Sequence, residues 1–415
     1  MSQHTPIYPQ ETLKQVLERI GKQANAYRPF VVAPQVVGGD TSLGAELRSV
    51  GQGGSLIYVK AGDPIQKAID AINAEGGGGT IFAEAGTHTI STALTGYSGI
   101  RFKGQSESTT IFDFNDTSAN LTLTGTNVYT TGTITSITGG VNVTGSGTAW
   151  LANAAAGRHF FLKNRWYKIA AVTGDTTLVL AEGYAGNATL PGASYRIASA
   201  IKDVDFEDIT FEDSTGTSLV FTDVRNITFK NCTLQSSNVG LAITNGSEIG
   251  SDNLIVVAHG SDGIQLTRVG FCDFESTPSA GNGGNGWTLS DCETIPIMVC
   301  GASSNTGDGM NLTDCSQILL TMDIEANGGQ GIEFVSGNSF ITVRDGYMRG
   351  NTSDGIKITG TGDNCIVQGV RITGNGGYGI NNAASTNDNN QFLDNIYDSN
   401  TTSNILDSGM GTVIR

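Results

Sequence analysis

The stretch Asp308-Gly309-Met310-Asn311-Leu312 is one copy of a pattern that recurs through the second half of the chain. Each copy has a glycine followed by an apolar residue, a polar residue and, in all copies but the last, another apolar residue. The motif glycines follow one another at intervals of 23, 23, 22, 24 and 24 residues, at Gly263, Gly286, Gly309, Gly331, Gly355 and Gly379. Such an internal period indicates a repeat protein, in which each repeat packs on its neighbours.

The residues between the motif glycines favour short strands, because apolar and polar side chains alternate with a period of two. A leucine-rich repeat would need a Leu-x-x-Leu-x-Leu frame and a helical segment in each repeat, and neither is visible. We therefore expect a β-solenoid with about three short strands and about 23 residues per coil. Asn-Gly-Gly at 327–329 and 375–377, and Gly350-Asn351, are predicted to supply corners with positive φ.

The register assigns each side chain to the inside or the outside of the solenoid. The residues predicted to point inward after the motif glycines are Ile264, Leu266, Trp287, Leu289, Met310, Leu312, Ile332, Phe334, Ile356 and Ile358. Seven residues before a motif glycine, Ile324, Met348 and Ile372 form another inward column. Their neighbours on each strand must then point outward, which gives the columns Asp323, Tyr347, Arg371 and Glu325, Arg349, Thr373. Because coils stack about 4.8 Å apart, these outward side chains are expected to form one compact patch.

Composition and charge exclude several classes of partner. The chain of 415 residues has a formal net charge of −16 and only 15% charged residues. This charge opposes binding to nucleic acid, which needs clustered cations, and to an anionic membrane surface. It does not oppose binding to a glycan. The first residues lack the basic segment and apolar run of a secretory signal, and no apolar stretch is long enough to span a bilayer.

The six cysteines show no spacing typical of a zinc site. Cys292 and Cys315 each lie six residues after a motif glycine, so they are expected to stack in neighbouring coils. A disulfide or a metal pair is one interpretation, but a ladder of buried free thiols is favoured. Asp262, Asp308 and Asp354 precede motif glycines and are expected to bind the backbone of the corners rather than a ligand. No metal and no cofactor is predicted.

The first half of the chain begins with an amphipathic segment at 63–74, followed by Gly76–Gly79, a strand at 80–83 and the turn Gly86-Thr87-His88. This order resembles the opening of the pectate-lyase-like β-helix superfamily, in which a short helix caps the first coil. The resemblance implies a right-handed parallel β-helix, all-β and with three sheets, over 55–120 and 199–415. The superfamily includes lyases, hydrolases, epimerases and non-catalytic spikes, so the resemblance does not by itself assign an activity.

Residues 121–198 interrupt the repeat. Gly147-Thr148-Ala149-Trp150, followed by Thr176-Thr177-Leu178-Val179-Leu180, resembles a small β module of bacteriophage tail proteins, in which a Gly-Thr-Ala-Trp strand precedes a hairpin. The resemblance implies an inserted all-β domain. Its aromatic residues are expected to form its own core rather than a platform for sugars: Trp150, Phe160, Phe161, Trp166, Tyr167 and Tyr184.

Residues 1–54 form a separate N-terminal segment with one amphipathic stretch, Glu11–Ile20, whose apolar residues recur at helical spacing. Such a stripe is usually a packing face. In a phage spike it would serve for trimerisation or for attachment to the virion.

No known catalytic signature of the superfamily is complete. The calcium-binding Asp residues and Arg-x-Pro-x-x-Arg segment of pectate lyases are missing, and so is the Asp-Pro-His segment of alginate epimerases. Asn305-Thr306-Gly307-Asp308 matches only part of the polygalacturonase pattern. Glycoside hydrolysis, however, needs only two carboxyl groups. Asp323 and Glu325 are the candidate catalytic pair.

Tyr347, Arg349 and Arg371, on the coils that follow Asp323 and Glu325, are candidates for binding a sugar. The alternative interpretation of this patch is an ion-pair cluster on the surface, which stabilises little. Glu333 and Lys357 are expected to form such a pair. A second acidic group is expected to be a solvated edge: Glu207, Asp208, Glu212 and Asp213.

Three function classes remain open at this point. The first is a tailspike of bacteriophage or prophage type, a homotrimer in the virion tail that binds, and in one alternative depolymerises, a bacterial surface polysaccharide. It would reach the cell exterior through lysis. The second is a non-catalytic β-helix adhesin or structural virion protein. The third is a polysaccharide lyase or epimerase, which the missing secretory signal makes less favoured.

Overall fold

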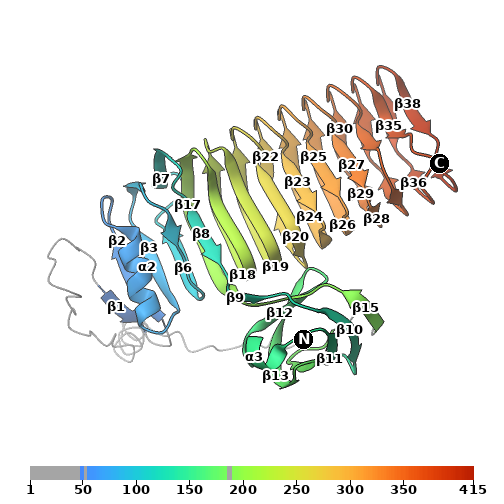
Figure 1. The fold of residues 1–415 in the computed structure, drawn as a ribbon. Helices are drawn as coiled ribbons and strands as arrows, with labels where there is room; N and C mark the ends of the chain where they lie inside the picture. The colour runs from blue at the N-terminus through green and yellow to red at the C-terminus, as the bar shows by residue number, and fades with distance from the viewer. Residues whose placement is uncertain (1–46, 51–53, 185–188) are drawn as a thin grey trace, which may run out of the picture.

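The computed structural model describes residues 47–50, 54–184 and 189–415. The stretch Glu11–Ile20 lies outside these residues. Figure 1 shows a long stack of parallel strands with a smaller sheet beside it. Within the described residues, 31 strands belong to the stack and 8 strands to the second sheet. The chain is therefore a parallel β-solenoid with about one coil per 23 residues, as the repeat predicts.

The stack begins with β1 (Leu47–Val50) and β2 (Gly54–Val59), which pair in antiparallel register. Helix α2 (Ile65–Ala74) then buries Ile65, Ala68, Ile69 and Ile72 against the first coils. The strands that follow are β3 (Gly79–Ala83), β4 (Gly86–Thr89), β5 (Leu94–Thr95), β6 (Ile100–Gly104), β7 (Thr110–Thr117) and β8 (Leu121–Thr124).

Three long strands continue the stack after the second sheet, because each turns corners without losing its pairing: β17 (Ile201–Ser214), β18 (Thr217–Gln235) and β19 (Val239–Val257). Shorter strands complete the coils: β20 (Ile264–Gly270), β21 (Asp273–Glu275), β22 (Pro278–Ala280), β23 (Trp287–Ser290), β24 (Glu293–Ser303), β25 (Met310–Thr313), β26 (Ser316–Glu325), β27 (Ile332–Ser336), β28 (Asn338–Ser339), β29 (Thr342–Arg344), β30 (Tyr347–Arg349), β31 (Ile356–Ile358), β32 (Gly362–Asp363), β33 (Ile366–Gln368), β34 (Arg371–Thr373), β35 (Tyr378–Asn382), β36 (Gln391–Leu393), β37 (Ile396–Asp398), β38 (Ser403–Asp407) and β39 (Val413–Ile414).

The predicted register is confirmed. β25 pairs in parallel with β23 and β27, so Met310 lies between Trp287 and Ile332 in neighbouring coils. All ten residues predicted to point inward after the motif glycines are buried, and so are Ile324, Met348 and Ile372. They belong to one continuous apolar core along the solenoid.

The prediction for the corner glycines is only partly right. Gly350 has a φ of 63°, but the Asn-Gly-Gly segments do not supply the positive φ. In those coils the left-handed residue comes one position earlier, at Ala326 (φ 55°) and Gly374 (φ 64°). Gly328 is instead required for space, since a Cβ there would lie 2.2 Å from the Thr306 carbonyl oxygen.

The asparagines of these corners form a buried ladder. Asn305 donates its side-chain amide to Asn327 Oδ1 at 2.9 Å, and Asn327 donates in turn to Asn351 Oδ1 at 2.9 Å. Each Oδ1 also accepts the backbone N–H of the asparagine one coil earlier, as Asn327 Oδ1 does from Asn305. Asn282 and Asn375 extend the ladder in the two directions. The ladder satisfies polar groups that the turn would otherwise leave unpaired in the core.

The favoured interpretation of the cysteines is confirmed, because all six are free and buried. Cys292 and Cys315 are 1% and 0% exposed. Asp262, Asp308 and Asp354 bind the corner backbone as predicted. Asp308 Oδ1, for example, accepts the Gln330 backbone N–H at 2.7 Å.

The second sheet lies between β8 and β17 in the chain and has its own core. Its elements are β9 (Thr126–Tyr129), β10 (Thr133–Thr138), β11 (Asn142–Ser146), α3 (Trp150–Asn153), β12 (His159–Leu162), β13 (Arg165–Gly174), β14 (Thr177–Leu180), β15 (Thr189–Ala193) and β16 (Arg196–Ser199). Its strands pair antiparallel, unlike those of the stack. We call this sheet with α3 the side module.

Of the six aromatic residues singled out in the sequence, all but the half-buried Tyr184 are buried, so they pack rather than form a sugar platform. Phe161 and Trp166 pack in a small cluster of their own with Ala198 and Ala200, not in the main core of the side module. The Gly147–Trp150 motif is not a strand here. It is a turn, with Gly147 at a φ of 67°, that leads into α3, because the Asp175 carbonyl oxygen accepts the Trp150 backbone N–H at 3.1 Å.

The side module is fastened to the solenoid by buried polar contacts. Trp166 donates its indole N–H to the Asn245 carbonyl oxygen at 2.7 Å, and Asn164 donates to the Asp291 carbonyl oxygen at 2.6 Å. Arg196 Nε lies 2.6 Å from Asp223 Oδ1, whose side chain is fully buried. In Figure 1 the module lies beside the solenoid near β18 to β20. Among the described residues, no helix is both long enough and apolar enough to cross a bilayer.

Candidate functional site

The charged patch predicted from the register is formed by three neighbouring strands. β26 pairs with β30, which places Asp323 beside Tyr347 and Glu325 beside Arg349. β30 pairs with β34, which places Tyr347 beside Arg371. We call these five residues the outer-face patch. The structure brings all of them together, because equal steps along the repeat place them in two adjacent columns, Asp323–Tyr347–Arg371 and Glu325–Arg349.

The members of the patch already contact one another. Arg349 Nε lies 2.5 Å from Glu325 Oε2, and this hydrogen bond raises the pKa of Arg349 above its ordinary value. Asp323 Oδ1 accepts the Tyr347 backbone N–H at 3.2 Å. The side chains of Arg349 and Glu325 are 59% and 41% exposed, and Tyr347 is 46% exposed. The patch is therefore an open, polar surface.

This geometry suits binding better than acid catalysis. A general acid in a glycosidase needs a carboxyl group whose proton is retained by burial or by a like charge. Glu325 is instead open to solvent and engaged by a guanidinium. Two guanidinium groups and an exposed phenol, by contrast, can donate hydrogen bonds to hydroxyl and carboxylate groups of a sugar.

The other acidic residues singled out in the sequence are engaged in ion pairs or lie at corners. Lys357 Nζ lies 3.1 Å from Glu333 Oε1, which confirms that pair. Glu207 pairs with Arg101 and Lys103, so it is not merely a solvated edge. The pKa of Asp213 is raised by burial and by nearby carboxylates, first Glu212.

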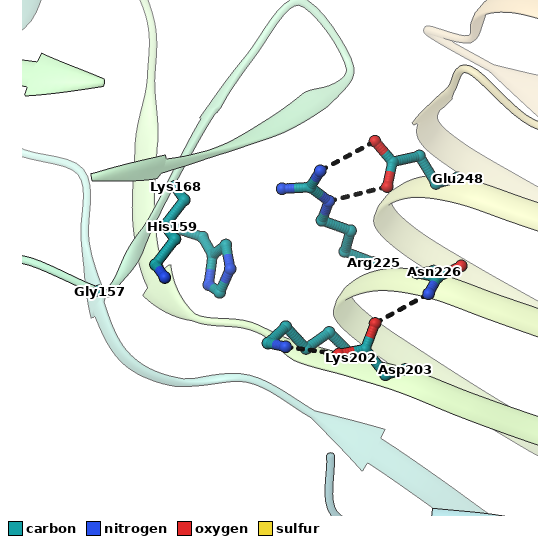
Figure 2. Close-up of a pocket in the computed structure, with 8 residues that line it drawn as sticks. All are labelled: Gly157, His159, Lys168, Lys202, Asp203, Arg225, Asn226 and Glu248. Atoms are coloured by element: carbon teal, nitrogen blue, oxygen red, sulfur yellow. Dashed lines mark hydrogen bonds and ion pairs between the residues drawn. The ribbon is translucent and has the colours of Figure 1, made fainter. Parts of the chain in front are cut away.

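A cavity of about 430 Å³ lies where the side module meets the solenoid. The side module contributes Gly157, His159 and Lys168, and the solenoid contributes Lys202, Asp203, Arg225, Asn226 and Glu248. Figure 2 shows the His159 ring between these two sets of residues. We call this the junction cavity. Nothing in the sequence indicated it, because it needs residues of two separate units, between 34 and 91 positions apart in the chain, to meet.

The cations of the junction cavity differ in the number of carboxylates that bind them. Arg225 is bound by two carboxylates, with Nε 2.8 Å from Glu248 Oε2 and Nη1 2.8 Å from Glu182 Oε1. Burial acts to lower the pKa of Arg225, but these bonds outweigh it and the pKa is raised. Lys202 Nζ lies 2.5 Å from Asp203 Oδ2. Lys168 has no ion pair within the described part of the chain.

His159 is the most buried side chain of the junction cavity, with 6% of its surface exposed. Burial, and then the charges of Arg225, Lys202 and Lys168, lower its pKa to about 4. The imidazole is therefore neutral near pH 7. Its Nδ1 atom is buried without a hydrogen-bond partner in the described structure.

Comparison with known proteins supports the fold. Residues 297–413 match the family described as the right-handed β-helix region. The A-module of the mannuronan C-5 epimerase AlgE4 from Azotobacter vinelandii superposes with a TM-score of 0.55 at 17% identity, over 83% of this chain and 94% of that one. The tailspike of Pseudomonas phage phi297 gives a TM-score of 0.41 at 10% identity, over 80% and 73% of the two chains.

The catalytic domain of a GH87 α-1,3-glucanase, solved with nigerose, gives a TM-score of 0.48 at 10% identity, over 85% of this chain and 68% of that one. No curated protein matches the sequence significantly. The AlgE4 superposition supports the fold alone, because its sequence identity is low, and the activity must be argued from the site.

Proposed function

We propose that this right-handed parallel β-helix is a tailspike-like protein that binds a bacterial surface polysaccharide along its outer-face patch. The observation that carries the proposal is the stacking of Tyr347 with Arg371, and of Glu325 with Arg349, on exposed strands of adjacent coils. Charged residues are scarce in this chain, at 15%, yet the patch concentrates four of them around one exposed tyrosine.

A solenoid surface suits a linear polymer. Coils repeat about every 4.8 Å, so equivalent side chains form a regular row along which successive sugar units can be bound. Guanidinium groups can bind carboxylates in bidentate fashion, and the face of a tyrosine ring can pack on the apolar face of a sugar. Asp323 adds a carboxylate, which can accept hydrogen bonds from sugar hydroxyls.

The tailspike assignment rests on two supports. One is the β-helix fold itself. The other is the resemblance of Gly147–Trp150 and Thr176–Leu180 to a tail module of bacteriophages. Location in the virion tail, a homotrimeric assembly and release through lysis belong to the same proposal. A non-catalytic adhesin would use the patch in the same way but without cleavage.

Cleavage, if the protein performs it, is assigned to Asp323 and Glu325, which point to the same side of β26 two residues apart. A lyase or an epimerase would need a base and a group that neutralises the uronate carboxylate, for which Arg349 and Arg371 are the candidates. The three activities differ in product, since hydrolysis gives reducing ends, elimination gives unsaturated uronates, and epimerisation leaves the chain intact.

The proposal is tested by incubating the purified protein with a panel of capsular and O-antigen polysaccharides, measuring retention together with both products. We expect at least one polysaccharide to be bound, and Tyr347→Ala and Arg371→Ala each to weaken binding at least tenfold. Arg344→Ala is the matched control, because Arg344 is also an exposed arginine of the solenoid but lies on β29, on a different face. The proposal is wrong if no polysaccharide is bound, or if the control variant loses as much affinity for the polysaccharide as Arg371→Ala does.

A further inference from the structure

We infer that the junction cavity binds a sugar unit that carries a carboxylate, so that the polysaccharide bound by this protein is acidic. The inference rests on the proposed function, because it assigns a substrate class to a polysaccharide-binding protein. It concerns a second place on the molecule. The junction cavity lies against β17, β18 and β19, whereas the outer-face patch lies on β26, β30 and β34, several coils further along (Figure 1).

The charge of the junction cavity is positive in a chain that is strongly negative. Its lining has three cations, Lys168, Lys202 and Arg225, against the two carboxylates of Asp203 and Glu248. The groups behind the lining leave this balance unchanged, since Glu182 binds Arg225 and Arg165 lies 4.0 Å from Glu248. One positive charge remains, while the whole chain has a formal net charge of −16. A ligand with a single negative charge would balance the cavity.

The excess charge is located at the Lys168 side of the cavity. Lys202 is held by Asp203, and Arg225 is held by Glu248 and Glu182. Lys168 comes from β13 of the side module, faces the cavity and has no ion pair among the residues that the structure describes. A carboxylate placed between Lys168 and Lys202 would meet two ammonium groups at once (Figure 2).

His159 supplies an independent sign of a missing partner. Its ring is nine-tenths buried and lines the cavity, but its Nδ1 atom is buried without a hydrogen-bond partner among the described residues. Buried polar groups are almost always satisfied, so an unsatisfied one calls for a ligand or a water. The cations that depress the pKa of His159 are the same groups that would bind an anion, namely Arg225, Lys202 and Lys168.

The size and the lining of the cavity favour a sugar over a small inorganic anion. A volume of about 430 Å³ lies within the range of small-ligand sites and is far more than one ion fills. Asn226 and Asp203 offer an amide and a carboxylate for sugar hydroxyls. A hexuronate unit has this combination, one carboxylate on a ring that bears hydroxyl groups.

The test compares three tetrasaccharides by calorimetry at low salt: tetragalacturonate, its full methyl ester and maltotetraose. We expect tetragalacturonate to bind at least tenfold more tightly than the other two. The double variant Lys168→Met/Lys202→Met should lose this preference. Lys357→Met is the matched control, because Lys357 is a half-buried lysine of the solenoid far from the cavity.

A second readout follows the His159 ring by NMR. Its pKa should rise from about 4 when tetragalacturonate saturates the wild-type protein, because the bound carboxylate offsets the three cations. A carboxylate bound elsewhere, for example at the outer-face patch, would leave this pKa unchanged. The shift therefore reports occupancy of the junction cavity rather than binding in general.

The inference is overturned if the methyl ester binds as tightly as the acid, if no probe binds, or if the double variant binds like the wild type. Loss of binding in Arg371→Ala alone, with the pKa of His159 unmoved, would leave the proposed function standing and remove the junction cavity from it. Loss of binding in the double variant alone would show that the junction cavity binds the acidic sugar and that the outer-face patch does not.

Discussion

Arg349 and Glu325 are 24 residues apart in the sequence and lie on adjacent coils, with Arg349 Nε 2.5 Å from Glu325 Oε2. The pair is exposed, so it adds little to the stability of the fold. It does fix the guanidinium and the carboxylate at the centre of the outer-face patch. Because the pair contributes little to stability, substitutions in the outer-face patch can change function without unfolding the protein.

The first prediction concerns the candidate catalytic pair. If the protein cleaves its polysaccharide, Asp323→Asn and Glu325→Gln should each abolish product formation, because a neutral amide cannot act as acid, base or nucleophile. The melting temperature should stay within a few degrees of the wild type. Glu333→Gln, which removes the carboxylate of another solenoid ion pair, is the control. Full activity in both variants would move the chemistry away from this patch.

The second prediction concerns the buried asparagine ladder. Asn327→Ala should destabilise the protein by about 3 kcal/mol, because it removes hydrogen bonds from several buried polar groups of the neighbouring coils. The Asn305 backbone N–H loses its acceptor, and the Asn305 side-chain amide, the Ala302 carbonyl oxygen and Asn351 Oδ1 each lose one hydrogen bond. Asn351 Oδ1 still accepts the backbone N–H of residue 327, and the Asn305 amide still donates to the Ser279 carbonyl oxygen. Denaturant titration measures the change. Asn311→Ala, at a half-exposed position of the same coil, should cost much less, and an equal loss of stability in the two variants would contradict this explanation.

The third prediction concerns pH. Burial lowers the pKa of His159 and of His259 to about 4, from an ordinary value of 6.5. Neutral His259 can accept the Ser237 backbone N–H at Nδ1 and donate from Nε2 to the Leu234 carbonyl oxygen, whereas protonated Nδ1 could not accept. Between pH 6.5 and pH 4 the two histidines are protonated in the unfolded chain but stay neutral in the folded chain. The free energy of unfolding is therefore highest above pH 6.5 and decreases towards pH 4.

Each of these histidines should contribute about 3 kcal/mol to this loss of stability, if its full shift applies. Unfolding free energies measured between pH 7 and 4 check the slope. His259→Gln should lower stability at pH 7 and flatten the pH dependence. An unchanged slope in that variant would show that other groups govern acid unfolding.

The fourth prediction concerns the thiols. Burial raises the pKa of Cys300 and Cys365 to about 11 and that of Cys232 and Cys272 to about 12, so they are protonated and inaccessible at pH 8. A thiol reagent should label none of the six cysteines in the folded protein and all six in denaturant. A mass two hydrogens lower than that of the reduced chain would reveal a disulfide and contradict the ladder.

A substitution tests how the thiol ladder packs. Cys292→Ser should cost about 1–2 kcal/mol, because it places a hydroxyl in an apolar core. The cost stays small because the Leu266 and Ser290 carbonyl oxygens, which accept from the thiol now, remain available to the hydroxyl. Thermal unfolding measures it. A loss of more than about 4 kcal/mol would mean that the thiol does more than fill space.

The fifth prediction concerns assembly. The resemblance to phage spikes and the amphipathic stretch Glu11–Ile20 predict a homotrimer, which light scattering at micromolar concentration would detect. Removal of residues 1–46 should then weaken the trimer while the solenoid core stays intact. A stable monomer of the full chain would contradict the prediction.

The sequence by itself determined the solenoid, its register and the contents of the outer-face patch. In a repeat of 23 residues, positions one period apart must stack, and alternation along each strand decides which side chains point outward. Both rules are local, so Asp323, Tyr347 and Arg371 could be assigned to one column from their spacing alone. The burial of Cys292 and Cys315 follows from the same two rules.

Only the tertiary structure decided the corners and the junction. The positive φ falls at Ala326, whereas Gly328 is needed for space, since a Cβ there would collide with the Thr306 carbonyl oxygen of the neighbouring coil. The junction cavity depends on where the side module docks, which is fixed by contacts such as Trp166 with Asn245 across 79 residues. No period relates His159 to Arg225. They come into proximity because the side module packs on the solenoid, and the spacing of residues within one unit does not determine how two units pack.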